Sequence, residues 1–145
     1  MEEIIQEKIS ADHLLYVSLK YTKTCDVIVN LLLRWSRMIE TSINEILKEA
    51  KRKKKISEVS GNPIGRIEQV KKVMKKDKNF LEVIELHNMF KRINDLRKER
   101  IGEFRKNVNL KVFFQGREID VNLEKLKEYS EKLEKFIDST KKYLS

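Results

Sequence analysis

One segment constrains the fold of this chain more than any other, an unbroken amphipathic stretch from about Thr24 to Arg52. It contains neither glycine nor proline, and its apolar residues recur with helical spacing at Ile28, Leu31, Leu32, Trp35, Met38, Ile39, Ile43, Ile46 and Leu47. Such spacing places these side chains along one face of a long helix. Because that face must be buried against other elements, the stretch predicts a bundle of packed helices.

Shorter apolar stripes predict four further helices that would cover this face. The first is expected to begin after a cap at Ser10 or Asp12, since either side chain can accept hydrogen bonds from free backbone N–H groups. The others are expected from about Gly65 to Lys76, from about Asn79 to Asn107, and from a cap at Asn122 through a stripe that ends at Leu144. The helix over 79–107 is long enough to pack antiparallel to the helix over 24–52.

Two segments depart from the helical pattern. Residues 57–64 hold the only proline and the Gly61-Asn62 pair, which predicts a loop where the chain reverses. In residues 111–121, β-branched and aromatic side chains flank Gln115-Gly116, which predicts a short β-hairpin or an irregular segment. With one proline and four glycines in 145 residues, the expected fold is all-α: an up-and-down bundle of about four or five helices in a single domain, residues 1–145.

The net charge of +9 is concentrated in residues 48–78, where twelve Lys and Arg residues face four acids. A local positive field of this size attracts polyanions. The candidate contacts with RNA or DNA are Lys51, Arg52, Lys53, Lys54, Lys55, Lys71, Lys72, Lys75 and Lys76. Because no aromatic residues are interleaved among them, binding would be directed to the phosphate backbone. The alternative interpretation is a solubilising helix end in a lysine-rich protein.

Catalytic and metal-binding patterns are scarce. His13 and His87 lie in no HExxH, CxxC or clustered carboxylate pattern, so we expect structural histidines and no metal site. No glycine-rich phosphate loop is present, and we expect neither a cofactor nor an enzyme. Cys25 begins a predicted helix, where a lowered thiol pKa and a simple packing role are both open. Trp35 fits either the core or a subunit interface, and we expect a homodimer.

The beginning of the chain, MEEIIQEKIS, lacks the basic start and apolar stretch of a signal peptide. The longest apolar stretch, Val27 to Leu33, is interrupted by Asn30 and is too short for a membrane span. These features favour a soluble cytoplasmic protein with no membrane partner. The abundance of Lys and Glu also fits a heat-adapted source.

The segment from Leu96 to Asn107 (LRKERIGEFRKN) supplies the last candidate residues. At helical spacing, Arg97, Arg100 and Arg105 would follow the edge of the apolar stripe. A long helix that ends in an Arg-rich segment, then an irregular connection and an amphipathic last helix, resembles the HEPN (higher eukaryote and prokaryote nucleotide-binding) helical bundles.

Active members of that family carry an arginine followed a few residues later by a histidine, commonly with asparagine after the arginine. Here Arg100 would take the arginine place, Ile101 stands where asparagine is common, and Arg105 stands where the histidine belongs. In another register Lys98 and Glu103 take the two places. The resemblance therefore implies the fold, a symmetric dimer and a degenerate groove around Arg97, Arg100 and Arg105, without the histidine that would transfer protons in RNA cleavage.

Three functions follow from these patterns. The first is a non-catalytic HEPN-like protein that dimerises and contacts nucleic acid or a nucleoprotein partner through its basic segments. The second is a subunit of a larger assembly, such as the partner of a nucleotidyltransferase in a toxin–antitoxin pair, without binding of free nucleic acid. The third is a metal-independent ribonuclease that would use Arg105 with Glu103, or the distant His87.

Overall fold

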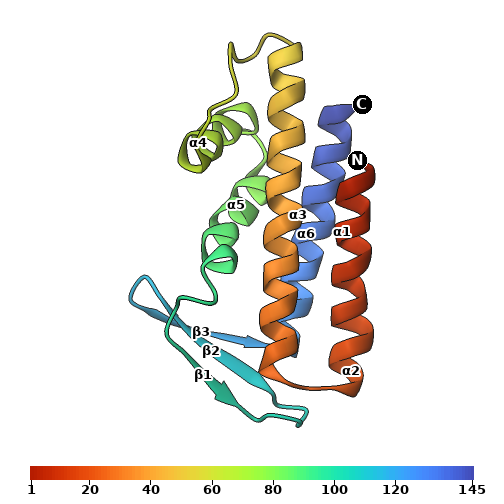
Figure 1. The fold of residues 1–145 in the computed structure, drawn as a ribbon, viewed down its shortest axis with the longest axis vertical. Coiled ribbons are helices and arrows are strands. Elements are labelled where there is room, and N and C mark those ends of the chain that lie inside the picture. The colour runs from red at the N-terminus through yellow and green to blue at the C-terminus, as the bar shows by residue number, and fades with distance from the viewer.

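Helix α3 (Cys25–Arg52) is the central element of the computed structural model, which describes all 145 residues (Figure 1). Its start is fixed by Thr24, whose side chain accepts a hydrogen bond from the Val27 N–H. The apolar face predicted from the sequence is buried, including Trp35 and Ile39. The prediction for this helix is therefore confirmed.

The remaining helices surround α3. They are α1 (Glu2–His13), which continues through the π-helical turn η1 (Leu14–Ser18) into α2 (Leu19–Tyr21), then α4 (Pro63–Val73), α5 (Lys78–Lys91) and α6 (Leu123–Leu144). In Figure 1, α1 and α5 run opposite to α3, whereas α6 runs in the same direction as α3. Asn62, Asp77 and Asn122 cap α4, α5 and α6 with their side-chain oxygens, as predicted for Asn122. No helix is both long enough and apolar enough to cross a bilayer.

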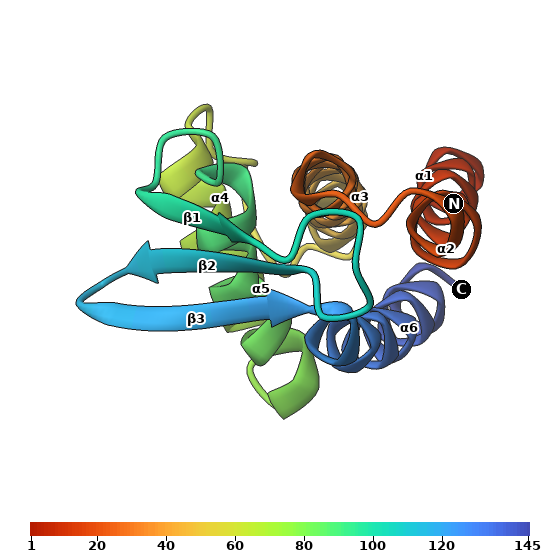
Figure 2. The same cartoon turned by 90° about the horizontal axis from the view of Figure 1, so that it is seen from below.

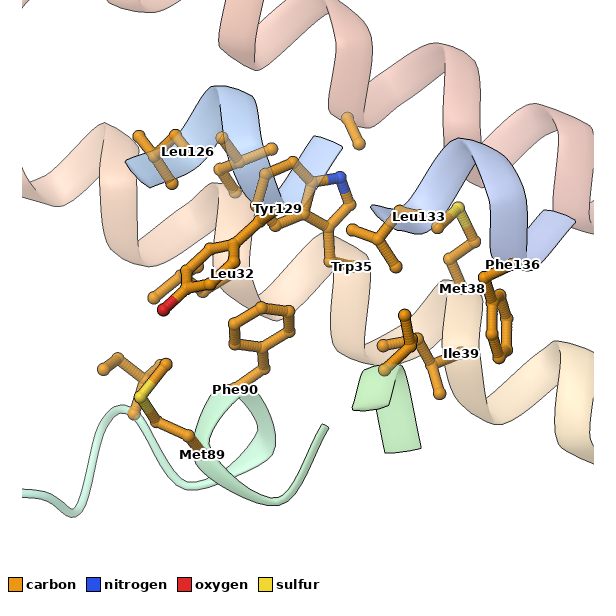
Figure 3. Packing of buried hydrophobic residues seen from close by; sticks show 14 of the residues in the cluster. Leu32, Trp35, Met38, Ile39, Met89, Phe90, Leu126, Tyr129, Leu133 and Phe136 are labelled. Carbon is orange, nitrogen blue, oxygen red and sulfur yellow. The ribbon is translucent and has the colours of Figure 1, made fainter. Parts of the chain in front are cut away.

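An aromatic cluster joins α3, α5 and α6 in the core (Figure 3). The ring centroid of Trp35 lies 5.8 Å from that of Phe90 and 6.4 Å from that of Tyr129. Aromatic pairs at such distances stabilise a core beyond the effect of burial alone. Trp35 thus packs in the core of a single chain, and its interpretation as a subunit contact is wrong.

The first helix begins earlier than predicted. Ser10 and Asp12 lie inside α1 and cap nothing, because the helix starts at Glu2. Two acids in its first turn, Glu2 and Glu3, favour the positive end of the helix dipole. The buried Ile4 and Ala11 extend the apolar face toward the N-terminus. The predicted start after Ser10 or Asp12 is therefore wrong, since residues 1–10 already carry apolar side chains at Met1, Ile4, Ile5 and Ile9.

A three-stranded antiparallel sheet closes one end of the bundle (Figures 1 and 2). Its strands are β1 (Lys98–Ile101), β2 (Asn109–Phe114) and β3 (Arg117–Asn122), in the order β1-β2-β3. Gln115 and Gly116 both have positive φ angles, 52° and 74°, as a two-residue type I′ hairpin turn requires. The hairpin prediction is confirmed, whereas a strictly all-α fold is wrong.

The predicted helix over 79–107 is wrong beyond its first half. Helix α5 ends at Lys91, and residues 98–101 form β1 instead, with Lys98 opposite Val112 of β2. β1 is an edge strand, and its charged side chains discourage pairing with the strands of other molecules. Its Lys, Glu and Arg residues are also good helix formers, so pairing with the hairpin overrode local propensity.

Candidate nucleic-acid interface

The basic run 51–55 forms the end of α3 and the turn that follows it. Lys54 has a φ of 62°, the left-handed conformation that commonly ends a helix. The Lys55 N–H donates to the Ala50 carbonyl at 2.8 Å, and the Lys54 N–H donates to the Lys51 carbonyl at 3.0 Å. These two bonds make a Schellman turn with a lysine where glycine is usual. The chain leaves α3 at a sharp angle, with its last lysines in solvent.

The five cations of this run have different surroundings. Lys51 pairs with Glu58 at 3.1 Å, and Arg52 pairs with Glu49. Lys53 contacts Tyr143, as described below. Lys54 and Lys55 are exposed and form no ion pair within the chain. Two members of the run are therefore free to meet an external anion.

The second basic stretch lies at the end of α4 and just beyond it. Lys71 pairs with Glu85 of α5 at 2.9 Å. Lys72, Lys75 and Lys76 are exposed and form no ion pair. This stretch thus also divides into one cation neutralised by a neighbouring helix and three that remain open to solvent.

Three of the five free cations, Lys55, Lys72 and Lys75, border one groove, which we call the basic groove. It encloses about 640 Å³ between the turn after α3, helix α4 and the end of α6. Its lining residues are Lys55, Ile56, Ser57, Glu58, Gln69, Lys72, Val73, Lys75 and Tyr143. Three lysines face a single acid, Glu58, which is itself paired with Lys51. The groove therefore attracts anions.

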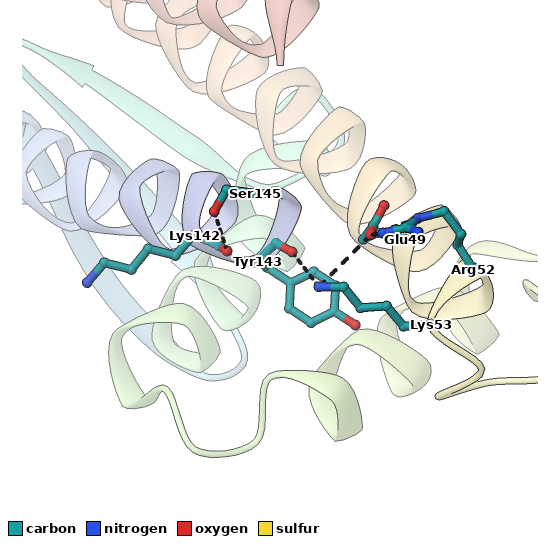
Figure 4. Close-up of polar contacts among 6 residues, drawn as sticks. All are labelled: Glu49, Arg52, Lys53, Lys142, Tyr143 and Ser145. Carbon is teal, nitrogen blue, oxygen red and sulfur yellow. Dashed lines mark hydrogen bonds and ion pairs between the residues drawn. The ribbon is translucent and has the colours of Figure 1, made fainter.

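Tyr143 is a residue of this groove that the sequence analysis missed. It comes from α6, far from both basic stretches in the sequence, and its ring lies beside the end of α3 (Figure 4). Lys53 Nζ lies 4.3 Å from the centroid of this ring and donates to the Tyr143 carbonyl oxygen at 2.8 Å. The Tyr143 hydroxyl oxygen is buried without a hydrogen-bond partner, and burial together with the nearby Glu49 raises the pKa of Tyr143. No local sequence signal links these residues.

Comparisons with family models, with curated proteins and with solved structures found no match to this chain.

Arg97, Arg100 and Arg105 do not share a helix face, contrary to the prediction. Arg97 follows α5 and lies over the Phe113 ring at 4.6 Å, and Arg100 on β1 pairs with Asp26 at 2.7 Å. Arg105 belongs to the loop between β1 and β2 and is exposed. The three side chains therefore lack the shared helix face on which the predicted groove depended, because the segment that carries them is a strand and a loop.

A second, smaller cleft brings His87 together with a carboxylate. His87 Nε2 lies 3.2 Å from Glu40 Oε1, and the two residues line a cavity of about 220 Å³ between α3, α4 and α5. Arg66 and Lys91 line the same cavity. The hydrogen bond from His87 lowers the pKa of Glu40, and the positive charges of Lys91 and Arg66 act in the same direction against burial. Sequence spacing gave no sign of this pair because its members lie on different helices.

Cys25 has no activated thiol. Its side chain is fully buried, and its Sγ donates to the Asn109 carbonyl at 3.4 Å. Burial, reinforced by Glu103, raises the thiol pKa to about 11. The alternative of a lowered pKa at the helix start is therefore wrong, since burial and a nearby carboxylate outweigh the helix dipole.

Proposed function

We propose that this protein binds nucleic acid through contacts between the basic groove and the phosphate backbone. One observation carries the proposal: cations from two separate stretches, Lys55 on one side and Lys72 and Lys75 on the other, border the same groove. Cations that merely solubilise a surface have no reason to converge. Three unpaired lysines around a groove are a suitable arrangement for contacts with several phosphates and for the release of their counterions.

The composition of the groove favours backbone contacts over base recognition. Lysine ammonium groups act as point charges without the planar fork that arginine offers to a guanine edge. The Tyr143 ring is engaged by Lys53 and forms part of the wall. We therefore propose binding with weak sequence preference and strong dependence on salt.

Salt-dependent titration of a labelled RNA and a labelled DNA duplex tests this proposal. The groove variant combines Lys55→Glu, Lys72→Glu and Lys75→Glu. A matched control combines Arg37→Glu, Arg117→Glu and Lys135→Glu and changes the net charge equally. These three cations lie outside the groove, are exposed and form no ion pair. We expect the groove variant to lose binding and the control to retain most of it. Equal losses in the two variants would show that net charge alone attracts the nucleic acid.

The wild-type titration also separates the proposal from membership of a larger assembly. The slope of log K against log salt should approach about −0.9 per phosphate contact with duplex DNA. Absence of binding at low salt, together with a protein partner that copurifies, would favour a role as a subunit of a larger assembly. A toxin–antitoxin pair with a nucleotidyltransferase is one example of such an assembly. We further propose that the protein is a homodimer and is non-catalytic, as the HEPN resemblance implies. Sedimentation equilibrium measures the mass of the dimer.

The cleft of His87 and Glu40 favours one second candidate, a metal-independent ribonuclease. A histidine held by a carboxylate is a suitable proton-transfer group, and Arg66 and Lys91 beside it would attract a phosphate. Purified protein should then degrade RNA in the presence of EDTA, and His87→Gln should abolish the activity while the helical content is kept. RNA that stays intact during long incubation with the wild-type protein excludes this candidate.

A further inference from the structure

Phe104 combines two properties that a folded chain seldom combines. Its φ angle is +66°, in the left-handed region that bulky side chains avoid, and its side chain is 76 % exposed. Contacts made by the ring inside the protein do not compensate for the strained backbone, since most of the ring lies in solvent. A strained residue that its own fold does not need is a sign of function at that position.

The loop that carries Phe104 is held firmly in place. The Phe104 N–H donates to the Lys23 carbonyl at 2.6 Å, and the Arg105 N–H donates to the Gly102 carbonyl at 3.0 Å. Gly102 has a φ of +67°, and a Cβ there would lie 2.9 Å from the Asn107 carbonyl oxygen. The loop is therefore preorganised, with little conformational entropy left to lose when a ligand binds.

The segment that hydrogen-bonds to this loop carries a second exposed aromatic residue, and both segments carry cations. Tyr21, two residues before Lys23, is 78 % exposed at the end of α2. Four cations from the same two segments form no ion pair within the chain: Lys20, Lys23, Arg105 and Lys106. The nearby acids are already engaged, since Asp26 pairs with Arg100 and Glu103 accepts from the Cys25 N–H. Figure 2 shows the loop between β1 and β2 beside the segment that joins α2 to α3.

We propose that Tyr21 and Phe104, with Lys20, Lys23, Arg105 and Lys106, form a stacking site for the unpaired bases of a single-stranded nucleic acid. Proteins bind such strands through exposed aromatic rings flanked by cations, because the bases stack on the rings and the phosphates pair with the cations. A duplex offers no free base faces and would not use the rings. The excess of unpaired cations distinguishes this surface from an apolar protein interface, where charged residues are depleted.

This stacking site does not depend on the basic groove. The two lie at opposite ends of α3, which has 28 residues and is therefore about 42 Å long. An oligonucleotide of about six nucleotides is in the size range of one single-strand site. Each site can consequently be tested while the other is left intact.

The decisive variant is Phe104→Gly, because glycine accepts the left-handed backbone without strain while the whole Phe104 side chain is removed. We expect its affinity for a labelled hexanucleotide to fall about ten-fold, a loss typical of one stacked base. Phe104→Trp should retain binding and should show quenching of the new indole fluorescence on titration, relative to wild type, in which Trp35 is buried. Binding of a duplex should be the same in all three proteins.

Other results would overturn the proposal. Unchanged hexanucleotide affinity in Phe104→Gly would show that the ring contacts no base. Wild-type protein that binds anionic vesicles through Phe104 but binds no hexanucleotide would make the loop a membrane contact, and a mass that halves in Phe104→Gly would make it a subunit interface. Loss of hexanucleotide binding in the groove variant, with unchanged binding in Phe104→Gly, would place the single-strand contacts in the basic groove and overturn the proposal.

Discussion

The Nζ atom of Lys53 lies 4.3 Å from the centroid of the Tyr143 ring and 2.8 Å from the carbonyl oxygen of the same residue (Figure 4). One lysine thereby ties the end of α3 to the last turn of α6 and fixes one wall of the basic groove. Lys53 is therefore a structural member of the basic run, unlike Lys54 and Lys55, whose ammonium groups have no acidic partner.

Lys53→Met should lower the free energy of unfolding by about 1 kcal/mol, since it removes the cation–π contact and the hydrogen bond to Tyr143. Urea denaturation followed by circular dichroism measures this change. The matched control is Lys54→Met, which removes the same charge without a tertiary contact and should leave stability nearly unchanged. Equal effects of the two substitutions would contradict a structural role for Lys53.

Lys54→Gly should act in the opposite direction on stability. Lys54 holds the left-handed position of the turn after α3, where glycine avoids the steric cost, so the free energy of unfolding should rise by about 0.5–1 kcal/mol. If Lys54 also attracts phosphate, the same variant should bind duplex DNA less tightly at low salt. Thermal melting and the titration described above measure the two effects, and a lower melting temperature would argue against the Schellman turn.

Alkaline pH should destabilise the fold through two buried acids. Burial, with Glu103 adding to it, raises the pKa of Cys25 from 9.0 to about 11, and burial raises the pKa of Tyr129 from 10.0 to about 12. The unfolded chain loses these protons first, so the free energy of unfolding should fall as pH rises from about 9 to about 12. Urea titrations across this range test the slope. Cys25→Ala should flatten the fall between pH 9 and 11, and an unchanged slope there would contradict the assignment to Cys25.

The Cys25 thiol should resist alkylation in the folded protein. Only the thiolate reacts, and the raised pKa leaves little of it at pH 8 in a side chain that solvent does not reach. Mass spectrometry after treatment with iodoacetamide should show unmodified protein under native conditions and one added group in urea. Rapid modification of the native protein would mean that the start of α3 opens readily.

Elements fixed by local chemistry could be predicted from the sequence. Asn122 caps α6 with its own side chain, and Gln115-Gly116 adopts the turn that such a pair favours. The apolar face of α3 is likewise a property of spacing along one segment. The HEPN resemblance, the homodimer and nucleic-acid binding itself stay predictions, since no comparison bears on them.

The tertiary structure decided what depends on partners distant in the sequence. Residues 98–101 have the composition of an exposed helix face, and only pairing with β2 makes them a strand. Lys55, Lys72 and Tyr143 share a groove because α4 folds back beside the ends of α3 and α6, and His87 meets Glu40 because α5 packs on α3. Spacing along a chain reports which residues share one face of one element. Which faces meet depends on how all the elements bury their apolar surfaces together, and the basic groove and the cleft of His87 and Glu40 both arise from that packing.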